Sequence, residues 1–461
     1  MSQNAHSGKK VRGPRYIAIE ILCRWEERHL PLDQIIGQYF TEIAPDAGRD
    51  RQLIISLVNG VVRWRSYIDW VLGRFSSYPL TKMKIRTLQA LRVGTFQMFF
   101  LDRIPPSAAV NETVQAFKDM RQPQWLAGFI NGILRNMERQ HLTIPTPFRN
   151  KDAVPETALL SHPEWLIQRW KERYGERQAI ALCEANNRQA HLCLRVNTRL
   201  STPLALIGKL KAAGIDAKMG KFSPIAVRID NYRGPIVTLP GFSEGLFQVQ
   251  GEAAQLVTLL LGPLQPGKTY LDGCAGLGGK FSHLAQIIPA GTNLEAIEQN
   301  FSRVQKLREN LARLRLEKTV TIVEGKIELL LPDRKEKYAG VLIDAPCSGL
   351  GVIRKHPEIR WHRTPGDLVR YHEIQSALLG TAADLVAPGG VLVYATCSIE
   401  PEENEEVVKE FLEHQPHFFV TDSRENLPAT CASLVDSAGF FRTMPFPDGL
   451  DGFFAARLIK N

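Results

Sequence analysis

Apolar residues recur at helical spacing through the first 140 residues of the chain. Two stretches show this spacing most clearly, namely Ile17, Ile21, Leu22 and Trp25, and then Leu53, Leu57, Val61 and Trp64. A further helical block from Ile85 to Met137 is interrupted at Ile104-Pro-Pro106, because proline cannot continue a helix. The pattern predicts an all-α domain over residues 1–145.

The pattern is less regular between residues 141 and 245. The stretch from His141 to Thr157 is polar and contains prolines at positions 145, 147 and 155, which predicts a linker. Residues 158–245 begin with helical spacing and continue with short apolar segments such as Leu192–Val196. This combination predicts a small α+β connecting domain.

From residue 246 onward, apolar strand-like segments alternate with helical patterns. The predicted strands cover residues 268–272, 292–298, 320–324, 339–344 and 390–396. Strands that alternate with helices predict an α/β domain with a doubly wound, mostly parallel sheet over residues 246–461. Ligands of such sheets bind outside the carboxyl ends of the strands, so we expect the chemistry at that edge.

The whole excess of positive over negative charge lies in the first third of the chain. The net charge is +9, and residues 1–150 contain 21 Lys and Arg against 12 Asp and Glu, whereas the remainder contains 36 of each. A basic domain of this kind favours a polyanionic partner such as nucleic acid, because phosphate contacts release counterions. The alternative is a solvated basic surface that only keeps the protein soluble.

Composition excludes several other classes of protein. With 44% hydrophobic and 23% charged residues, the chain is neither disordered nor fibrous. Its seven cysteines are odd in number and lack any C-x-x-C pair, which argues against a disulfide framework and a zinc site. The polar N-terminus lacks the apolar stretch of a secretory signal, and no apolar run is long enough to span a membrane. We therefore expect a cytoplasmic protein without a bound metal.

The first chemical motif is a glycine-rich turn over residues 271–280, directly after a predicted strand. Such a turn lets the backbone approach a ligand, and the following helix offers its N–H groups to an anion. The dinucleotide pattern G-x-G-x-x-G fails, because Phe281 stands at its third glycine when the count starts at Gly276. Glu298 ends the next strand, where an acid can accept hydrogen bonds from ribose hydroxyls. The alternative is a tight turn followed by a solvated carboxylate.

A second motif delivers Asp344 and then Cys347 to the end of the hydrophobic strand that begins near Val341. An isolated cysteine at such a place is more often a small buried hydrophobe than a nucleophile. The loop that follows is basic and carries one tryptophan, which favours contact with phosphates and a stacked base. Its residues of interest are Arg354, Lys355, His356, Arg360 and Trp361.

A third motif, Y-A-T-C-S, brings Cys397 to the end of another strand, and P-E-E-N follows at residues 401–404. Two cysteines that each follow a strand point to thiol chemistry more strongly than either one alone. The chain contains neither a G-x-S-x-G elbow nor a G-x-x-x-x-G-K-[ST] loop, which disfavours an α/β-hydrolase and a P-loop NTPase.

Taken together, these motifs resemble those of the RNA cytosine-5 methyltransferases of the Sun/Fmu family. The loop D-x-C-A-x-x-G-G-K, then D-A-P-C-S-G with G-V-I-R-K-H-P-E-I-R-W, and then Y-A-T-C-S with P-E-E-N occur in the family's order. Residues 1–145 resemble the NusB RNA-binding domain through L-R-V-G, V-N-E and F-I-N-G-I-L. The resemblance implies a Rossmann-like methyltransferase domain, preceded by a NusB-like domain and a connecting domain.

The resemblance also implies an activity and its partners. The family transfers a methyl group from S-adenosylmethionine (SAM) to carbon 5 of a cytosine in RNA, through a covalent adduct with a cysteine. For this chain it implies 16S ribosomal RNA or a small-subunit precursor as partner. It further implies a monomer that needs neither a membrane nor a metal.

Site residues follow from the matching motif positions. Cys397 would be the nucleophile, Cys347 would help to release the product, and Asp344 would lie between the cofactor and the base. The residues that would bind SAM are Cys274, Ala275, Gly276, Leu277, Gly278, Gly279, Lys280, Glu298, Lys326 and Asp344, with Glu298 on the ribose.

Two positions depart from the family pattern. The family usually has Ala-Pro where this chain has Gly276-Leu277, and it has an aspartate for the adenine amino group where this chain has Lys326. A lysine cannot accept that hydrogen bond. A non-catalytic RNA-binding factor therefore stays an alternative. Methylation of a nucleobase amino group predicts a D/N-P-P-Y/F motif, and the chain instead has Asp344-Ala-Pro-Cys.

Overall fold

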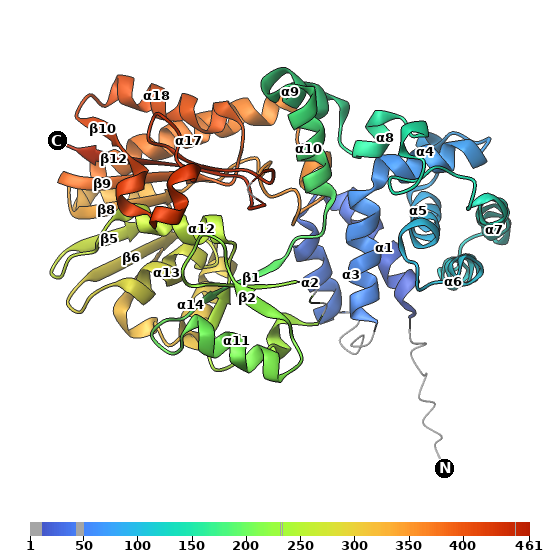
Figure 1. Ribbon diagram of the computed structural model, residues 1–461, viewed down its shortest axis with the longest axis horizontal. Coiled ribbons are helices and arrows are strands. Elements are labelled where there is room, and N and C mark those ends of the chain that lie inside the picture. Colours follow the sequence, from blue (N-terminus) through green and yellow to red (C-terminus); the bar gives the residue numbers. More distant parts are fainter. Residues whose placement is uncertain (1–11, 43–49, 231, 233, 448) are drawn as a thin grey trace, which may run out of the picture. The chain divides into compact units, whose positions relative to one another are not determined.

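The computed structural model describes residues 12–42, 50–230, 232, 234–447 and 449–461, and it divides into two units (Figure 1). The first unit comprises residues 1–187 together with the segment His356–His362. The second unit comprises residues 188–355 and 363–461. The predicted domain boundaries at residues 145, 158 and 245 stay predictions.

The described part of the first unit is built from helices. These are α1 (Pro14–Arg28), α2 (Leu32–Glu42), α3 (Arg51–Arg63), α4 (Arg65–Phe75), α5 (Ile85–Phe100), α6 (Pro106–Asp119), α7 (Gln124–Gln140), α8 (Glu156–Leu160), α9 (Glu164–Tyr174), α10 (Glu176–Asn187) and α16 (Ile359–His362). Large side chains such as Trp25, Tyr67 and Phe117 are fully buried between them. Helices α3 and α5 approach so closely that a Cβ at Gly60 would lie 1.9 Å from the Phe96 ring.

The stretch predicted as a linker packs onto this helical core. Ile144 and Val154 are buried, and the Tyr67 hydroxyl donates a hydrogen bond of 3.0 Å to the Pro145 carbonyl. Prolines and polar residues between two patterns favour an exposed connection, but here a few apolar side chains anchor the stretch to the helices.

The second unit begins with a small antiparallel sheet in the strand order β2-β3-β1-β4. Its strands are β1 (Leu192–Val196), β2 (Ala217–Met219), β3 (Ala226–Ile229) and β4 (Phe247–Val249), with α11 (Pro203–Ala212) beside β2 and β3. Leu194, Val196 and Phe247 face a core shared with Leu206 and Leu210 of α11. This arrangement confirms an α+β element between the helices and the large sheet.

The large sheet has the strand order β10-β12-β9-β8-β5-β6-β7, with β11 paired to β12. Its strands are β5 (Thr269–Asp272), β6 (Asn293–Glu298), β7 (Val320–Glu324), β8 (Tyr338–Asp344), β9 (Val386–Thr396), β10 (Phe418–Thr421), β11 (Phe441–Thr443) and β12 (Phe453–Lys460). The run from β9 to β7 is parallel, and β12 is antiparallel to both β9 and β10.

Helices cover both faces of this sheet (Figure 1). Along β8, Val341 and Ile343 face the core formed with α17 (Pro365–Leu385) and α18 (Glu405–His414), whereas Leu342 faces the core of α13 (Gly279–Ile287) and α14 (Phe301–Arg313). Successive side chains of a strand point to opposite faces, so a strand covered on both sides is hydrophobic throughout. The predicted doubly wound, mostly parallel α/β domain is confirmed.

Candidate active site

Two thiols meet at the carboxyl ends of neighbouring parallel strands. Cys347 follows β8 and Cys397 follows β9, and their sulfur atoms lie 3.1 Å apart. Pairing of β8 with β9 continues to the strand ends, where the N–H of Ala345 donates to the carbonyl of Ala395 over 2.8 Å. Just beyond, the N–H of Gly351 donates to the Cys397 carbonyl over 3.0 Å. The turn after each strand is thereby fixed against the other, and both cysteines stay partly exposed.

The surroundings of Cys347 favour its neutral, protonated form. Its hydrogen bond with Cys397 and its removal from bulk water raise the pKa of Cys347 well above the ordinary value for cysteine. Because the thiolate rather than the thiol is the nucleophilic form of cysteine, the raised pKa of Cys347 disfavours this residue as the attacking group.

A carboxylate and an ammonium group form an ion pair at the same edge of the sheet. Lys280 Nζ lies 2.6 Å from Asp344 Oδ2, with the lysine side chain 7% exposed and the aspartate side chain 33% exposed. The ammonium group also lies 5.0 Å from the centre of the Phe453 ring. Asp344 ends β8, three residues before Cys347, so a polar group that can bind a ring amine stands beside the thiols.

The glycine-rich turn connects β5 to α13. Gly276 and Gly278 have φ of +56° and +83°, in the left-handed region that L side chains rarely adopt. A Cβ at Gly278 would lie 2.2 Å from Leu307 Cδ1 of α14, so only glycine fits there. Glu298, at the end of β6, accepts hydrogen bonds from the N–H groups of Gly276 (3.0 Å) and Asn300 (2.8 Å). The turn and the acid thus form one ordered cradle.

A buried arginine of the small sheet supports the start of α13. Arg195 of β1 is 1% exposed and donates to the Gly279 carbonyl (2.6 Å), to Ser282 Oγ (2.7 Å) and to Gln250 Oε1. Burial lowers the pKa of Arg195 to about 9. The support that Arg195 gives to α13 could not be predicted from the sequence, because an arginine within a short strand pattern gives no sign of its partners.

Asp272 lies beneath the turn and was not among the predicted site residues. It is 1% exposed, and its Oδ1 accepts the N–H of Cys274 over 3.2 Å. Burial and the nearby Asp344 together raise the pKa of Asp272 to about 7, against the opposing effects of the Cys274 N–H and Lys280. Carboxyl groups with strongly shifted pKa values cluster at functional sites, and its position directly before the glycine-rich turn is the signal that marks it.

Some predicted cofactor residues lie on the open side of the site. Leu277 is 50% exposed, and its carbonyl accepts a hydrogen bond of 3.0 Å from Asn310 Nδ2. Lys326 is exposed just after β7, and Gly325 before it has a φ of +148°. By contrast, Cys274 and Ala275 pack against the cores on the two faces of the sheet, and Lys280 is buried. The roles of all these residues stay predictions.

The expectation that the basic loop binds RNA is wrong for Arg360, and for the partly buried Trp361 it stays a prediction. Arg360 is fully buried in the first unit and donates to the Ser161 carbonyl (2.9 Å) and to Asn187 Oδ1 (2.6 Å). Trp361 Nε1 donates to the Val62 carbonyl over 2.7 Å. Both side chains therefore anchor the segment His356–His362 among the helices, because burial of their long apolar portions leaves the polar ends to be paired with backbone oxygens.

The other cations of that loop are also engaged. Lys355 Nζ lies 2.6 Å from Asp451 Oδ2, and Arg354 donates to the Gly449 carbonyl over 3.1 Å. Asp451 is 7% exposed, so this ion pair holds the loop to the segment before β12. A basic run in a sequence does not reveal which of its members already have an acidic partner.

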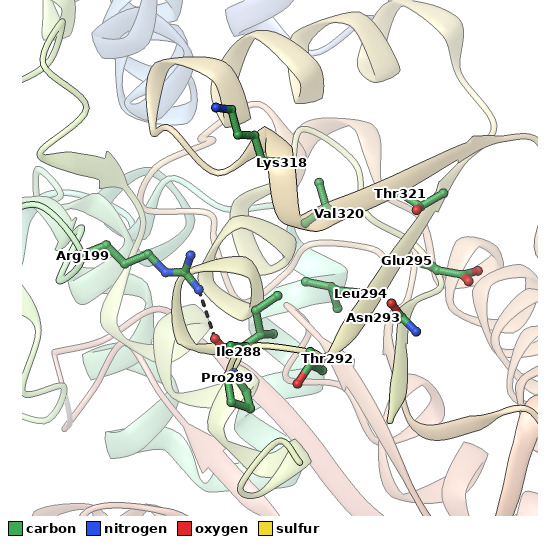
Figure 2. Close-up of a pocket in the computed structure, with 12 residues that line it drawn as sticks. Arg199, Ile288, Pro289, Thr292, Asn293, Leu294, Glu295, Lys318, Val320 and Thr321 are labelled. Atoms are coloured by element: carbon green, nitrogen blue, oxygen red, sulfur yellow. Dashed lines mark hydrogen bonds between the residues drawn. The ribbon is translucent and has the colours of Figure 1, made fainter. Parts of the chain in front are cut away.

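A cavity of about 590 Å³ lies elsewhere in the second unit (Figure 2). It is lined by Asn293 and Leu294 at the start of β6 and by Val320 at the start of β7, and Arg199 donates to the Ile288 carbonyl at its rim. These are the amino ends of parallel strands, the edge opposite to the two thiols. This cavity is therefore separate from the candidate active site.

Within the ranges that the structure describes, His, Cys, Asp and Glu side chains form no group of three or more that could hold a metal ion. In the same part of the chain, no helix is both long and apolar enough to cross a membrane.

Comparisons with known proteins cover nearly the whole chain. The family described as 16S rRNA methyltransferase RsmB/F matches residues 258–459, the NusB family matches residues 12–139, and the ferredoxin-like domain of RsmF/B-like methyltransferases matches residues 162–234. The ribosomal RNA small subunit methyltransferase B of Salmonella paratyphi A is 34% identical over 437 residues, 93% of this chain and 97% of that protein.

The fold of this chain is also similar to that of solved structures. The crystal structure of PH0851 is similar with a TM-score of 0.79 and 26% identity, over 97% of this chain and 99% of that one. A methyltransferase homolog protein from Pyrococcus horikoshii is similar with a TM-score of 0.56 and 27% identity, over 66% of this chain and 98% of that one.

The doubly wound sheet, the glycine-rich turn and the acid at the end of β6 define a Rossmann-like methyltransferase that uses SAM. The NusB-like helices and the ferredoxin-like sheet that precede it narrow the class further. The chain belongs to the RsmB/F family of 16S rRNA methyltransferases, which confirms the resemblance seen in its motifs.

Proposed function

We propose that this enzyme methylates carbon 5 of a cytosine in 16S ribosomal RNA through a covalent adduct with Cys397. The observation that supports the proposal most is the 3.1 Å separation of the Cys347 and Cys397 sulfur atoms beside Asp344. Two thiols serve no purpose in simple methyl transfer to an amino group. They are useful when one sulfur bonds to the substrate and the other assists its departure.

The residues present fit SAM. A Cβ at the left-handed Gly276 would meet nothing within 4 Å, so the backbone there is open to a ligand, and the Glu298 carboxylate has lone pairs beyond those used by its two backbone donors. We assign the cofactor to Cys274–Lys280, Glu298 and Asp344. Lys326 stands where the family pattern has the aspartate for the adenine amino group, and because a lysine cannot accept that hydrogen bond, Glu324 or a backbone carbonyl would serve instead.

Cys397 would begin the reaction. Carbon 5 of cytosine is a weak nucleophile, and addition of a thiolate to carbon 6 turns it into an enamine carbon. In this step a carbon–sulfur bond forms, the ring double bond opens, and its electron pair moves towards carbon 5. Bound SAM supplies the methyl group that carbon 5 takes up. Asp344, paired with Lys280, would bind the exocyclic amine and hold the activated ring in place.

Cys347 would act at the end of the reaction. Once the carbon-5 proton has left to a base, the electron pair of that bond restores the ring double bond and expels the Cys397 thiolate. The raised pKa of Cys347 keeps it protonated beside the departing sulfur, where a hydrogen bond stabilises the developing negative charge. The raised pKa of Cys347 thus supports the product-release role that the resemblance implies for this residue.

The target base must leave its helix to reach these thiols. Flipping is easiest in looped or single-stranded RNA, and the excess of positive charge in residues 1–150 suits the surrounding phosphates. The seven cysteines are unpaired in the structure, and the cytoplasm, where thiols stay reduced, is the compartment we propose.

The test is to incubate the protein with methyl-labelled SAM and 16S RNA, free and within a small-subunit particle, and to digest the RNA to nucleosides. We expect the label in 5-methylcytosine. Label in a methylated amino group would contradict the proposed chemistry. SAM binding by calorimetry without any transfer to either substrate would favour the RNA-binding factor instead.

A further inference from the structure

A buried carboxylate joins the two turns that carry the thiols. Glu403 lies on the short 3-10 helix η7 (Pro401–Glu403) and is 0% exposed. Its Oε1 accepts the N–H of Ser348 (2.6 Å) and Nε2 of Gln375 (3.2 Å), and its Oε2 accepts the hydroxyls of Ser348 and Ser398, each over 2.5 Å. Ser348 directly follows Cys347, and Ser398 directly follows Cys397.

The two serines are committed to this carboxylate. Their hydroxyl oxygens lie 3.3 Å apart, and each also accepts a backbone N–H, from Leu350 (3.4 Å) and from Glu400 (3.2 Å) respectively. Each hydroxyl has a single proton to donate, and Glu403 accepts that hydrogen bond from both serines. Both serines are 0% exposed, so water does not compete for these bonds.

Glu403 itself is held by the strand that carries Cys397. The Tyr394 hydroxyl of β9 donates to the Glu403 carbonyl over 2.6 Å, and Thr396 Oγ1 donates to Asn404 Oδ1 over 2.6 Å. Asn404 Nδ2 in turn donates to the Ser398 carbonyl over 3.2 Å. The carboxylate is therefore fixed to the β9 side and reaches across to the turn after β8.

A carboxylate at this depth is costly, and its partners in the described part of the chain are all neutral donors. Burial raises the pKa of Glu403, while the hydrogen bonds from Ser348 and Ser398 favour its charged form. A fold that only needed to fill this volume would be served as well by an apolar side chain. The position calls for an acceptor that binds both turns at once.

We propose that Glu403 is a positioning residue that fastens the Cys347 turn to the Cys397 turn and so sets the distance between the two thiols. The proposal rests on the proposed function for its purpose, since a two-cysteine reaction needs both sulfur atoms at one ring. Its geometry is independent of that function, because the distance between the thiols can be measured without substrate.

The experiment compares Glu403→Gln and Glu403→Ala with the wild-type chain and with Glu402→Gln as a matched control. Glu402→Gln removes the same charge from the same turn, whereas the hydroxyls of Ser348 and Ser398 both donate to Glu403. Each protein is treated with diamide, and formation of the Cys347–Cys397 disulfide is followed by peptide mass spectrometry. Alkylation of the same thiols by iodoacetamide corrects for changed accessibility, and methyl transfer is measured in parallel.

Loss of a buried, charge-assisted hydrogen bond corresponds to a factor of about ten or more, so Glu403→Ala should slow disulfide formation by that factor relative to alkylation. Glu403→Gln keeps one acceptor for the Ser348 N–H and should show an intermediate rate, with kcat lowered more than KM is raised. Glu402→Gln should match the wild type.

Wild-type disulfide rates in Glu403→Gln would overturn the proposal, even if Glu403→Ala fails to fold. If the wild type makes no 5-methylcytosine but both Glu403 variants still form the disulfide more slowly than it does, the positioning role stands and only the proposed reaction is refuted.

Discussion

The half of the site that holds the thiols and the half that would hold the cofactor are built in different ways. Cys347 and Cys397 are fixed by side chains, through a buried network in which Glu403 binds the turns of both. The cofactor half is fixed by backbone conformation, with Gly276 and Gly278 in left-handed geometry. One half depends on which side chains are present, and the other depends mainly on the course of the chain.

The two expected departures from the family pattern, Gly276-Leu277 and Lys326, lie in the half that would hold the cofactor. A Cβ at Gly276 would meet nothing within 4 Å, Leu277 is half exposed, and Lys326 is exposed. Substitutions at such open positions disturb little packing. At the thiol half the motif is intact, since any change there would strand a buried donor or acceptor.

The largest effect should come from the thiol half. Cys397→Ala removes the proposed nucleophile, so methyl transfer to RNA should fall below detection while SAM binding by calorimetry stays within about twofold of the wild type. Retained turnover would place the nucleophile elsewhere and would remove the functional contrast between the two halves.

A second effect concerns Asp272, between the two halves. Its pKa is about 7 when folded and near 4 when unfolded, so the folded state binds the extra proton between these values. The contribution of Asp272 to the stability of the wild type should therefore fall as pH rises from 4 to 7 and then level off. Asp272→Asn keeps an acceptor for Cys274 and lacks this loss, so it should be more stable than the wild type at pH 8 by about 2–4 kcal/mol, less so at pH 4.

Urea unfolding at pH 4, 6 and 8 measures this change. Asp344, Lys280 and Glu298 face Asp272, so the same series in Asp344→Asn serves as the control for their coupling. A stability difference between Asp272→Asn and the wild type that does not vary with pH would show that Asp272 titrates normally.

The cofactor half should also depend on Arg195, which supports the first turn of α13. Arg195 holds the first turn of α13, whereas Arg199 donates to the carbonyls of Gln286 (2.8 Å) and Ile288 (3.0 Å) at the other end of the same helix. Arg195→Met should weaken SAM binding about tenfold, which is about 1.4 kcal/mol, because the turn loses its support. Arg199→Met is the matched control and should leave SAM affinity nearly unchanged in calorimetry. Equal effects of both variants would assign Arg195 to general stability.

The smallest expected effect is at Lys326. Lys326→Asp places an acceptor after β7, and SAM binding should tighten severalfold, by about 1 kcal/mol, through a hydrogen bond to the adenine amino group. Isothermal titration at two salt concentrations separates this bond from a change in overall charge. An affinity identical to that of the wild type would mean that residue 326 does not reach the adenine.

Strand positions were the most predictable part of the fold, because strands covered on both faces are continuously apolar and end at turn residues. The last parallel strand begins at Val386 rather than 390, since Tyr338 pairs with Val386 across an irregularity that includes Pro388 and Gly389. Cys347, Cys397 and Asp344 were found together because parallel strands bring their carboxyl ends to one edge.

Buried polar residues were the least predictable part. The sequence favoured an exposed Arg360, and it indicated no role for Glu403 of the P-E-E-N motif. Both residues are fully buried. A sequence shows that a residue is charged but not which distant backbone or hydroxyl groups surround it. The serine after each cysteine was the available signal for Glu403, since paired hydroxyls at adjoining strand ends call for a shared acceptor.

The most direct test of the account is to trap the covalent adduct. Cys347→Ala is incubated with 16S RNA and SAM, denatured, digested with protease and nuclease, and examined by mass spectrometry. The account predicts a denaturant-resistant protein–RNA species in which the peptide containing Cys397 is joined through sulfur to a methylated cytosine, and its absence from the Cys347→Ala/Cys397→Ala double variant. An adduct on another residue, or methyl transfer by the double variant, would contradict it.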